Sequence, residues 1–123
     1  MLATLCAYEN RFGPYHPYTL RLAVMVAEGL DEGGDAARAR RLLERTARDL
    51  DGVEEPAYEL EMLVRSALRD VLTEQRDFVS AGAVQRRIVE ATAARFGSDH
   101  AETSAERSRL ADLLFHDAAC PAA

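Results

Sequence analysis

Apolar residues recur at three- and four-residue steps along this chain, which is the spacing of one buried face of an α-helix. Between Pro17 and Gly33 the pattern predicts one helix, and between Asp35 and Gly52 it predicts a second. Gly33-Gly34 ends the first helix because glycine tolerates a positive φ, and the Asp35 side chain caps the second. The expected apolar faces are Leu20, Leu22, Ala23, Val26, Ala27 and Leu30, and then Ala36, Ala39, Leu43, Ala47 and Leu50.

This plan repeats with a period of 42 residues, the length of one helix pair. Phe12-Gly13 and Phe96-Gly97 are 84 residues apart, and Pro56 follows Pro14 by 42. Other positions in the same register are Leu30, Leu72 and Leu114, Asp35 and Asp77, and Ala39 and Ala81. The expected divisions are a partial helix (1–10), two full repeats (11–52 and 53–94), a half repeat (95–117) and a tail (118–123).

The later repeats predict helices with apolar faces of their own. In the second repeat, Asp77 is expected to cap the second helix and Gly97 to end it. In the half repeat, Asp99 and Glu102 are expected to form a capping box. The second repeat offers Leu60, Leu63 or Val64, Ala67 or Leu68, and Val71 or Leu72, followed by Phe78, Ala81, Val84, Ile88 and Ala91. The half repeat offers Leu110, Ala111, Leu113 and Leu114.

Two residue types with possible site chemistry, histidine and cysteine, fall at positions that favour structural roles. His16 and His100 occupy the same repeat position, as does Tyr58, so capping or packing at the turn explains them better than a ligand role. No set of side chains has the spacing of a metal site, and none is expected. Cys6 and Cys120 match no CxxC motif. They are expected to be reduced thiols, with a disulfide as the alternative if the chain ends meet.

The overall composition narrows the class of function. The net charge is −6 and all 15 basic residues are arginine, so the basic stripe of a nucleic-acid-binding protein is missing. No apolar run reaches the roughly 18 residues of a membrane span, and no secretory signal precedes the first helix, which predicts a cytoplasmic protein. The arginine and alanine bias is typical of a GC-rich bacterial genome. No phosphate loop or nucleophile motif occurs, so no enzyme activity and no cofactor are expected.

The turn and the helix positions resemble the 42-residue tetratricopeptide repeat of kinesin light chains. The matching residues are Phe12, Gly13, Pro14, His16, Pro17, Thr19, Val26-Ala27, Gly34, Ala39, Ala81 and Leu110-Ala111. The resemblance implies an all-α, right-handed α-solenoid of stacked antiparallel helix pairs, forming a single domain over residues 1–123. It also implies a protein–protein interaction module, an adaptor or regulatory scaffold.

The chain departs from the family pattern in two ways. Members of the family often carry two asparagines that hold the backbone of a bound peptide, and here these positions are Val24-Met25, Ser66-Ala67 and Ser108-Arg109. Arg69 also falls where a small residue is expected, so the first helix of the second repeat has either slipped by one residue or packs loosely.

Repeat-equivalent positions of the first helices form rows on the surface that the family uses for binding. One row keeps a carboxylate in all three copies, and a basic, arginine-containing segment of a protein or peptide is the expected partner; the alternative is a solvated helix face. The expected partner-binding residues are Glu28, Asp70 and Asp112 in this row, Glu32, Glu74 and His116 in a second row, and Arg21.

A second function is suggested by the two ends of the chain, where the expected repeats are incomplete. Uncapped terminal helices would make the chain a homo-oligomeric assembly element, such as a homodimer, or a piece of a longer array. The apolar residues expected to be uncovered are Met1, Leu2, Leu5, Leu113, Leu114 and Phe115.

Overall fold

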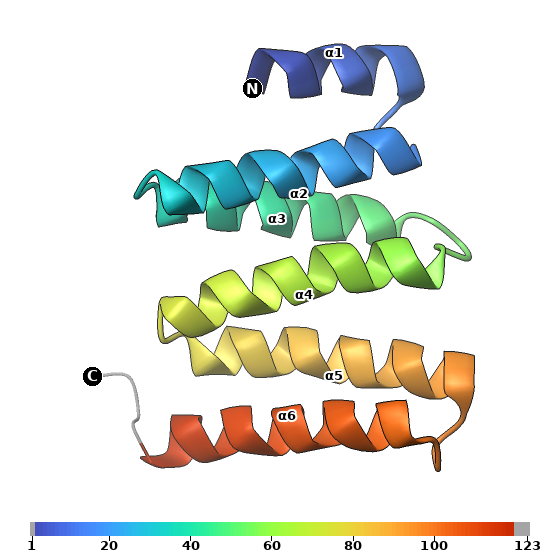
Figure 1. Cartoon of the computed structure of the whole chain (residues 1–123), viewed down its shortest axis with the longest axis vertical. Helices are drawn as coiled ribbons and strands as arrows, with labels where there is room; N and C mark the ends of the chain where they lie inside the picture. Colours follow the sequence, from blue (N-terminus) through green and yellow to red (C-terminus); the bar gives the residue numbers. More distant parts are fainter. Residues whose placement is uncertain (1, 120–123) are drawn as a thin grey trace. The chain divides into compact units, whose positions relative to one another are not determined.

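The computed structural model describes residues 2–119, and this part of the chain contains six α-helices and no strand (Figure 1), which confirms the all-α prediction. The helices are α1 (Leu2–Phe12), α2 (Pro17–Glu32), α3 (Ala36–Asp51), α4 (Tyr58–Glu74), α5 (Phe78–Phe96) and α6 (Ala101–Ala119). None of these described helices is both long and apolar enough to cross a membrane. The chain divides into two compact units, Met1–Ala67 and Leu68–Ala123, and the division falls within α4.

The turn between the two helices of each pair keeps the 42-residue period. The helix α2 ends at Glu32 and α4 ends at Glu74, while α3 begins at Ala36 and α5 begins at Phe78. These pairs are each 42 positions apart, so the end of α4 keeps the register, although α4 begins one residue earlier than the same spacing from Pro17 would place it. The helix α6 continues past residue 117, where the half repeat was expected to end.

In the first unit, α2 packs against both α1 and α3. The helices α2 and α3 run antiparallel through a tight turn (Figure 1). Gly34 in this turn has φ of +88°, and the Asp35 carboxylate accepts a hydrogen bond of 3.2 Å from the Arg38 N–H, as predicted. Most residues of the expected faces of α2 and α3 are buried, but Leu22, Leu30 and Ala36 are only half-buried, and Val24 and Leu42 are buried although they were not expected to be. The buried apolar residues of the unit are Leu5, Leu20, Ala23, Val24, Val26, Ala27, Ala39, Leu42, Leu43, Ala47, Leu50 and Val64.

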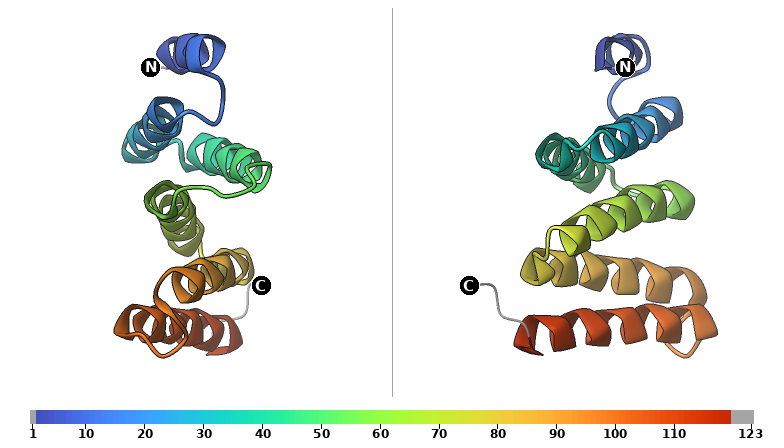
Figure 2. Two further views of the ribbon diagram at one scale, coloured as in Figure 1. Left: turned by 90° about the vertical axis from the view of Figure 1, so that its right-hand side faces the viewer. Right: turned by 60° about the vertical axis from the view of Figure 1, so that its left-hand side comes forward.

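In the second unit, α5 and α6 lie side by side and run antiparallel (Figure 2). The face of α5 that is buried differs from the prediction. Val84 and Ala91 are only half-buried, whereas Gln85 and Thr92 are buried beside Phe78, Ala81, Gly82 and Ile88. The prediction was wrong because it followed apolar residue types, while the regular stripe along α5 includes polar residues that have internal partners. The Thr92 hydroxyl, for example, donates to the Ile88 carbonyl oxygen at 2.8 Å.

The expected apolar face of α6 is also wrong in part. Of its four residues only Leu113 is buried, Leu110 is half-buried, and Ala111 and Leu114 are exposed. Thr103 and Glu106 are buried instead, and both are hydrogen-bonded within the unit. Among the residues expected to be uncovered, Leu5 and Leu113 are buried by neighbouring helices, whereas Leu2, Leu114 and Phe115 are exposed as expected. Met1 lies outside the described residues.

The two repeat-equivalent histidines act as helix N-caps. The Nδ1 atom of His16 accepts from the Tyr18 N–H, and that of His100 accepts from the Glu102 N–H, both at 3.1 Å. The capping box predicted between Asp99 and Glu102 is therefore wrong. Because α6 begins at Ala101, the capping position falls on His100, one residue after Asp99. The structural role predicted for these histidines is confirmed.

The rings around the caps repeat as well. The Phe12 and His16 ring centroids are 4.8 Å apart, and the Phe96 and His100 centroids are separated by the same distance. The glycine that follows each phenylalanine has a positive φ. The same local chemistry thus builds the entry to α2 and to α6.

We expect His100→Ala to lower the free energy of unfolding by about 1 kcal/mol, because an N–H at the start of α6 loses its acceptor. His100→Asn should recover most of this loss, since asparagine also accepts at the capping position. Urea unfolding of the full chain, followed by circular dichroism, measures both variants. Equal midpoints for His100→Ala and the parent chain would contradict the capping role.

Gly82 is buried within α5, where glycine lowers helix stability. A Cβ atom at this position would lie 3.8 Å from Leu114 Cδ2, an ordinary van der Waals contact. We therefore expect Gly82→Ala to raise the free energy of unfolding by about 0.5–1 kcal/mol. The neighbouring exposed residue supplies the matched control: Ala83→Gly should lower stability by a similar amount in the same urea titration.

Candidate functional site

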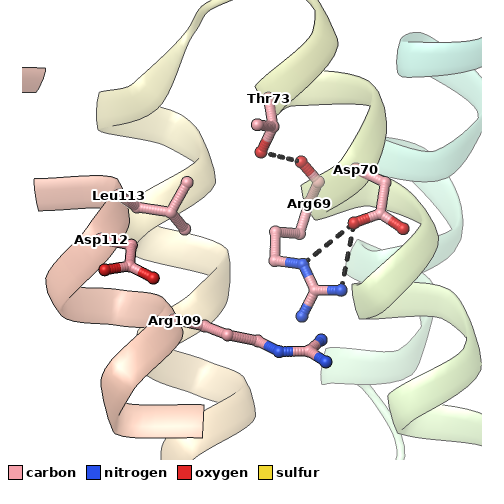
Figure 3. Close-up of a pocket in the computed structure, with 6 residues that line it drawn as sticks. All are labelled: Arg69, Asp70, Thr73, Arg109, Asp112 and Leu113. Carbon is pink, nitrogen blue, oxygen red and sulfur yellow. Dashed lines mark hydrogen bonds and ion pairs between the residues drawn. The ribbon is translucent and has the colours of Figure 1, made fainter. Parts of the chain in front are cut away.

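A pocket of about 230 Å³ lies in the second unit, with walls from α4 and α6 (Figure 3). Four of its six lining residues are charged, two arginines and two aspartates. Two of the predicted partner-binding residues, Asp70 and Asp112, are among them, so the structure brings these two carboxylates to one site. The full lining is Arg69, Asp70, Thr73, Arg109, Asp112 and Leu113.

A buried polar network lies beside this pocket and links three helices. Arg69 Nη1 on α4 donates to Gln85 Oε1 on α5 at 3.0 Å. Gln85 Nε2 in turn donates to the Glu106 carbonyl oxygen at 2.8 Å and to Glu106 Oε2 at 3.2 Å. The residues Arg69, Gln85 and Glu106 are 9 %, 0 % and 8 % exposed. Every member of this network therefore has a partner in place of the water it has lost.

The network occupies positions that are apolar one repeat earlier in the chain. The residues 42 positions before Arg69, Gln85 and Glu106 are Ala27, Leu43 and Val64. These three earlier residues are at most 1 % exposed. The second unit has thus replaced an apolar trio by a hydrogen-bonded polar one.

This replacement explains why Arg69 departs from the family pattern. The end of α4 keeps the 42-residue register, and the buried Arg69 side chain is paired with Gln85 and Asp70. Within the described residues no buried side-chain nitrogen or oxygen lacks a partner. The sequence does contain a sign of this polar network: three polar residues occupy positions that align with apolar core residues of the preceding repeat.

The charges around the pocket are unevenly matched. Asp70 Oδ1 accepts from Arg69 Nε and Nη2, both at 3.1 Å, and Arg109 Nε lies 3.6 Å from Glu106 Oε1. Figure 3 shows the Arg109 side chain extending from α6 toward α4. Asp112 forms no hydrogen bond or ion pair with any described residue. Two guanidinium groups therefore face three carboxylates, and the free charge at the mouth of the pocket is negative.

The other predicted residues of the second unit lie outside this pocket. Glu74 is exposed at the end of α4 and is not part of the lining. The His116 ring stacks on Phe78 with centroids 5.4 Å apart, which gives it a packing role on α6. Of the second predicted row, neither residue in this unit joins Asp70 and Asp112.

The predicted residues of the first unit lie on one exposed face of α2. Glu28 and Glu32 are exposed near its end, and Arg21 is exposed nearer its start. Arg21 lines a second pocket, of about 380 Å³, whose other walls are apolar or aromatic. The sequence analysis did not predict this pocket, because its apolar residues come from two helices that the hydrophobic pattern treats separately. The full lining is Tyr8, Tyr18, Arg21, Leu22 and Met25.

Among residues 2–119, no group of three or more histidine, cysteine, aspartate or glutamate side chains could hold a metal ion. Cys6 is an exposed free thiol, and Cys120 lies outside the described residues. Comparison with known proteins found no matching family model, no matching curated protein and no matching solved structure.

Proposed function

We propose that the chain is a protein–protein interaction module, a cytoplasmic adaptor or scaffold that carries out no catalysis. Its helix pairs would stack as a right-handed solenoid of the tetratricopeptide kind. Two observations support this: the 42-residue spacing of the helix bounds, and the phenylalanine–histidine cap that recurs at His16 and His100. Repeated helix pairs expose rows of equivalent side chains, and such rows suit the binding of an extended partner.

The partner is a segment that carries a positive charge. The observation that supports this most directly is Asp112, an exposed carboxylate that pairs with none of the described residues, in a pocket where both arginines already face carboxylates. An arginine side chain of the partner would add a bidentate pair with Asp112 and bring the charges of the pocket into balance. Glu28, 84 residues earlier at the equivalent position, is also exposed and has no ion pair within residues 2–119.

A short arginine peptide tests this directly. Acetyl-Ala-Arg-Ala-amide should shift the backbone amide resonances of residues 109–113 in an isotope-labelled sample, and the same peptide with neutral citrulline should not. Asp112→Asn should weaken the response by about threefold or more, the scale of one exposed charge pair. Glu90→Gln, which removes an exposed carboxylate of α5 away from the pocket, should have no effect. Equal responses to arginine and citrulline would reject the proposed partner.

Self-association is a second candidate function, favoured by exposed apolar side chains on α6. Leu114 is 43 % exposed and Phe115 is 69 % exposed. A second copy would bury this surface and gain the hydrophobic free energy. Light scattering separates the two candidates, because Phe115→Ser should reduce the mass of an oligomer. A monomer at all protein concentrations would remove self-association as a function.

A further inference from the structure

The exposed face of α2 combines three kinds of side chain along one line. Arg21 lies near the start of this line, Met25 follows one turn later, and Glu28 and Glu32 lie at the other end. Their spacing of three or four residues places them on the same side of the helix. None of the three charged residues forms an ion pair with a described residue. The line therefore offers a positive charge at one end and two negative charges at the other.

The pocket around Arg21 provides the apolar part of this face. Tyr18 and Met25 are both 59 % exposed, and they line the pocket together with Tyr8, Leu22 and Arg21. Aromatic and methionine side chains with this exposure are typical of surfaces that bind an apolar anchor. A cationic anchor is disfavoured here, since it would lie next to Arg21. An aromatic or aliphatic side chain of the partner fits the apolar cavity, and a carboxylate next to it in the partner's sequence would pair with Arg21.

We propose that the α2 face binds an extended segment of a partner protein. In this segment an acidic residue is followed directly by an apolar residue, and a basic residue comes three positions after the apolar one. The spacing follows from the helix. Glu28 and Glu32 lie about 10 and 16 Å along α2 from Arg21. An extended chain covers about 3.3 Å per residue, so four residues from the carboxylate bring the basic group between the two glutamates.

This inference rests on the proposed role as an interaction module and specifies its partner more closely. It also accounts for Val24-Met25 at the positions where the family often has asparagines. Val24 is buried and Met25 lines the pocket, so recognition here depends on the partner's side chains. The partner's charge pattern, rather than its backbone alone, sets the affinity.

Two peptides with the same composition test the proposal. Acetyl-Glu-Phe-Ala-Ala-Arg-amide has the proposed pattern, and acetyl-Arg-Phe-Ala-Ala-Glu-amide exchanges its charges while keeping the anchor. The first should bind about threefold more tightly, measured from amide shifts of residues 18–32, because the second opposes like charges at both ends. Arg21→Gln should reduce this preference, and Met25→Ala should weaken both peptides. Arg48→Gln, at an exposed position of α3, is the matched control and should change neither.

Three outcomes would overturn the inference. The first is equal affinity for the two peptides. The second is that neither peptide shifts the α2 resonances at millimolar concentration. The third is that these resonances change with protein concentration alone. The last result would assign the face to a second copy of the chain. The arginine tripeptide described above tests a different site, residues 109–113. If neither that peptide nor the two α2 peptides shifts any resonance, the proposed role as an interaction module is rejected as well.

Discussion

Glu106→Ala is expected to lower the free energy of unfolding by about 3 kcal/mol, the largest effect of any single substitution considered for this chain. The variant removes a carboxylate that is 8 % exposed and whose Oε2 atom lies 3.9 Å from Nη1 of the buried Arg69 guanidinium. Gln85 Nε2 also loses one of its two acceptors. A buried charge without full compensation is costly because water can no longer solvate it.

The apolar trio of the first unit supplies the control for this prediction. The triple variant Arg69→Ala, Gln85→Leu and Glu106→Val carries the residue types found at Ala27, Leu43 and Val64. Replacing a whole buried ionic network by apolar residues of similar volume is often neutral or stabilising, and here the smaller alanine adds the cost of a cavity, so the triple variant should lose clearly less free energy of unfolding than Glu106→Ala. Urea titrations of the parent and both variants provide the comparison. If the triple variant is as unstable as Glu106→Ala, then lost packing rather than an uncompensated charge explains the effect.

The parts of the fold that sequence reasoning predicted are those determined by local chemistry. Gly34 takes the positive φ that ends α2, and Asp35 and Asp77 cap the helices that follow them. Each of these depends on residues within one turn, so a single sequence carries the information. The alignment of repeats then transfers the helix bounds from one unit to the next.

The polar core of the second unit was missed for the opposite reason. A hydrophobic pattern assigns Gln85 and Glu106 to solvent, because nothing nearby in the sequence indicates that a residue on another helix will pair with them. Their partners are 16 and 21 positions away in the chain. Only the comparison with Leu43 and Val64, the aligned core residues, could have revealed that these positions face inward.

The candidate site was also predicted only in part. Repeat spacing placed Asp70 and Asp112 in one row, and both line a single pocket. The sequence did not show that Arg69 pairs with its neighbour Asp70 while Asp112 pairs with no described residue, since that depends on the conformations of the side chains. The difference matters for function, because a carboxylate that already has a partner gains less from a second cation.

Gly97→Ala is expected to lower the free energy of unfolding by about 2–3 kcal/mol. Gly97 ends α5 with φ of 101° and ψ of 154°, a backbone conformation that is essentially restricted to glycine. A Cβ atom here would meet no other atom within 4 Å, so the loss would come from backbone strain alone. The turn has little freedom to relax, because the Gly97 carbonyl oxygen accepts from the Thr103 hydroxyl at 2.7 Å.

Gly34→Ala provides the matched comparison, since Gly34 also has a positive φ and open space around it. The residue 42 positions later, Arg76, adopts φ of 61°, so a side chain is tolerated at the equivalent turn. We therefore expect Gly34→Ala to cost only about 1 kcal/mol, the lower end for a left-handed non-glycine residue. Thermal and urea unfolding of the two variants should rank Gly97→Ala as clearly the less stable. Equal losses would mean that the α5–α6 turn relaxes to an ordinary conformation once a side chain is present, and that the glycine there is not required by the backbone.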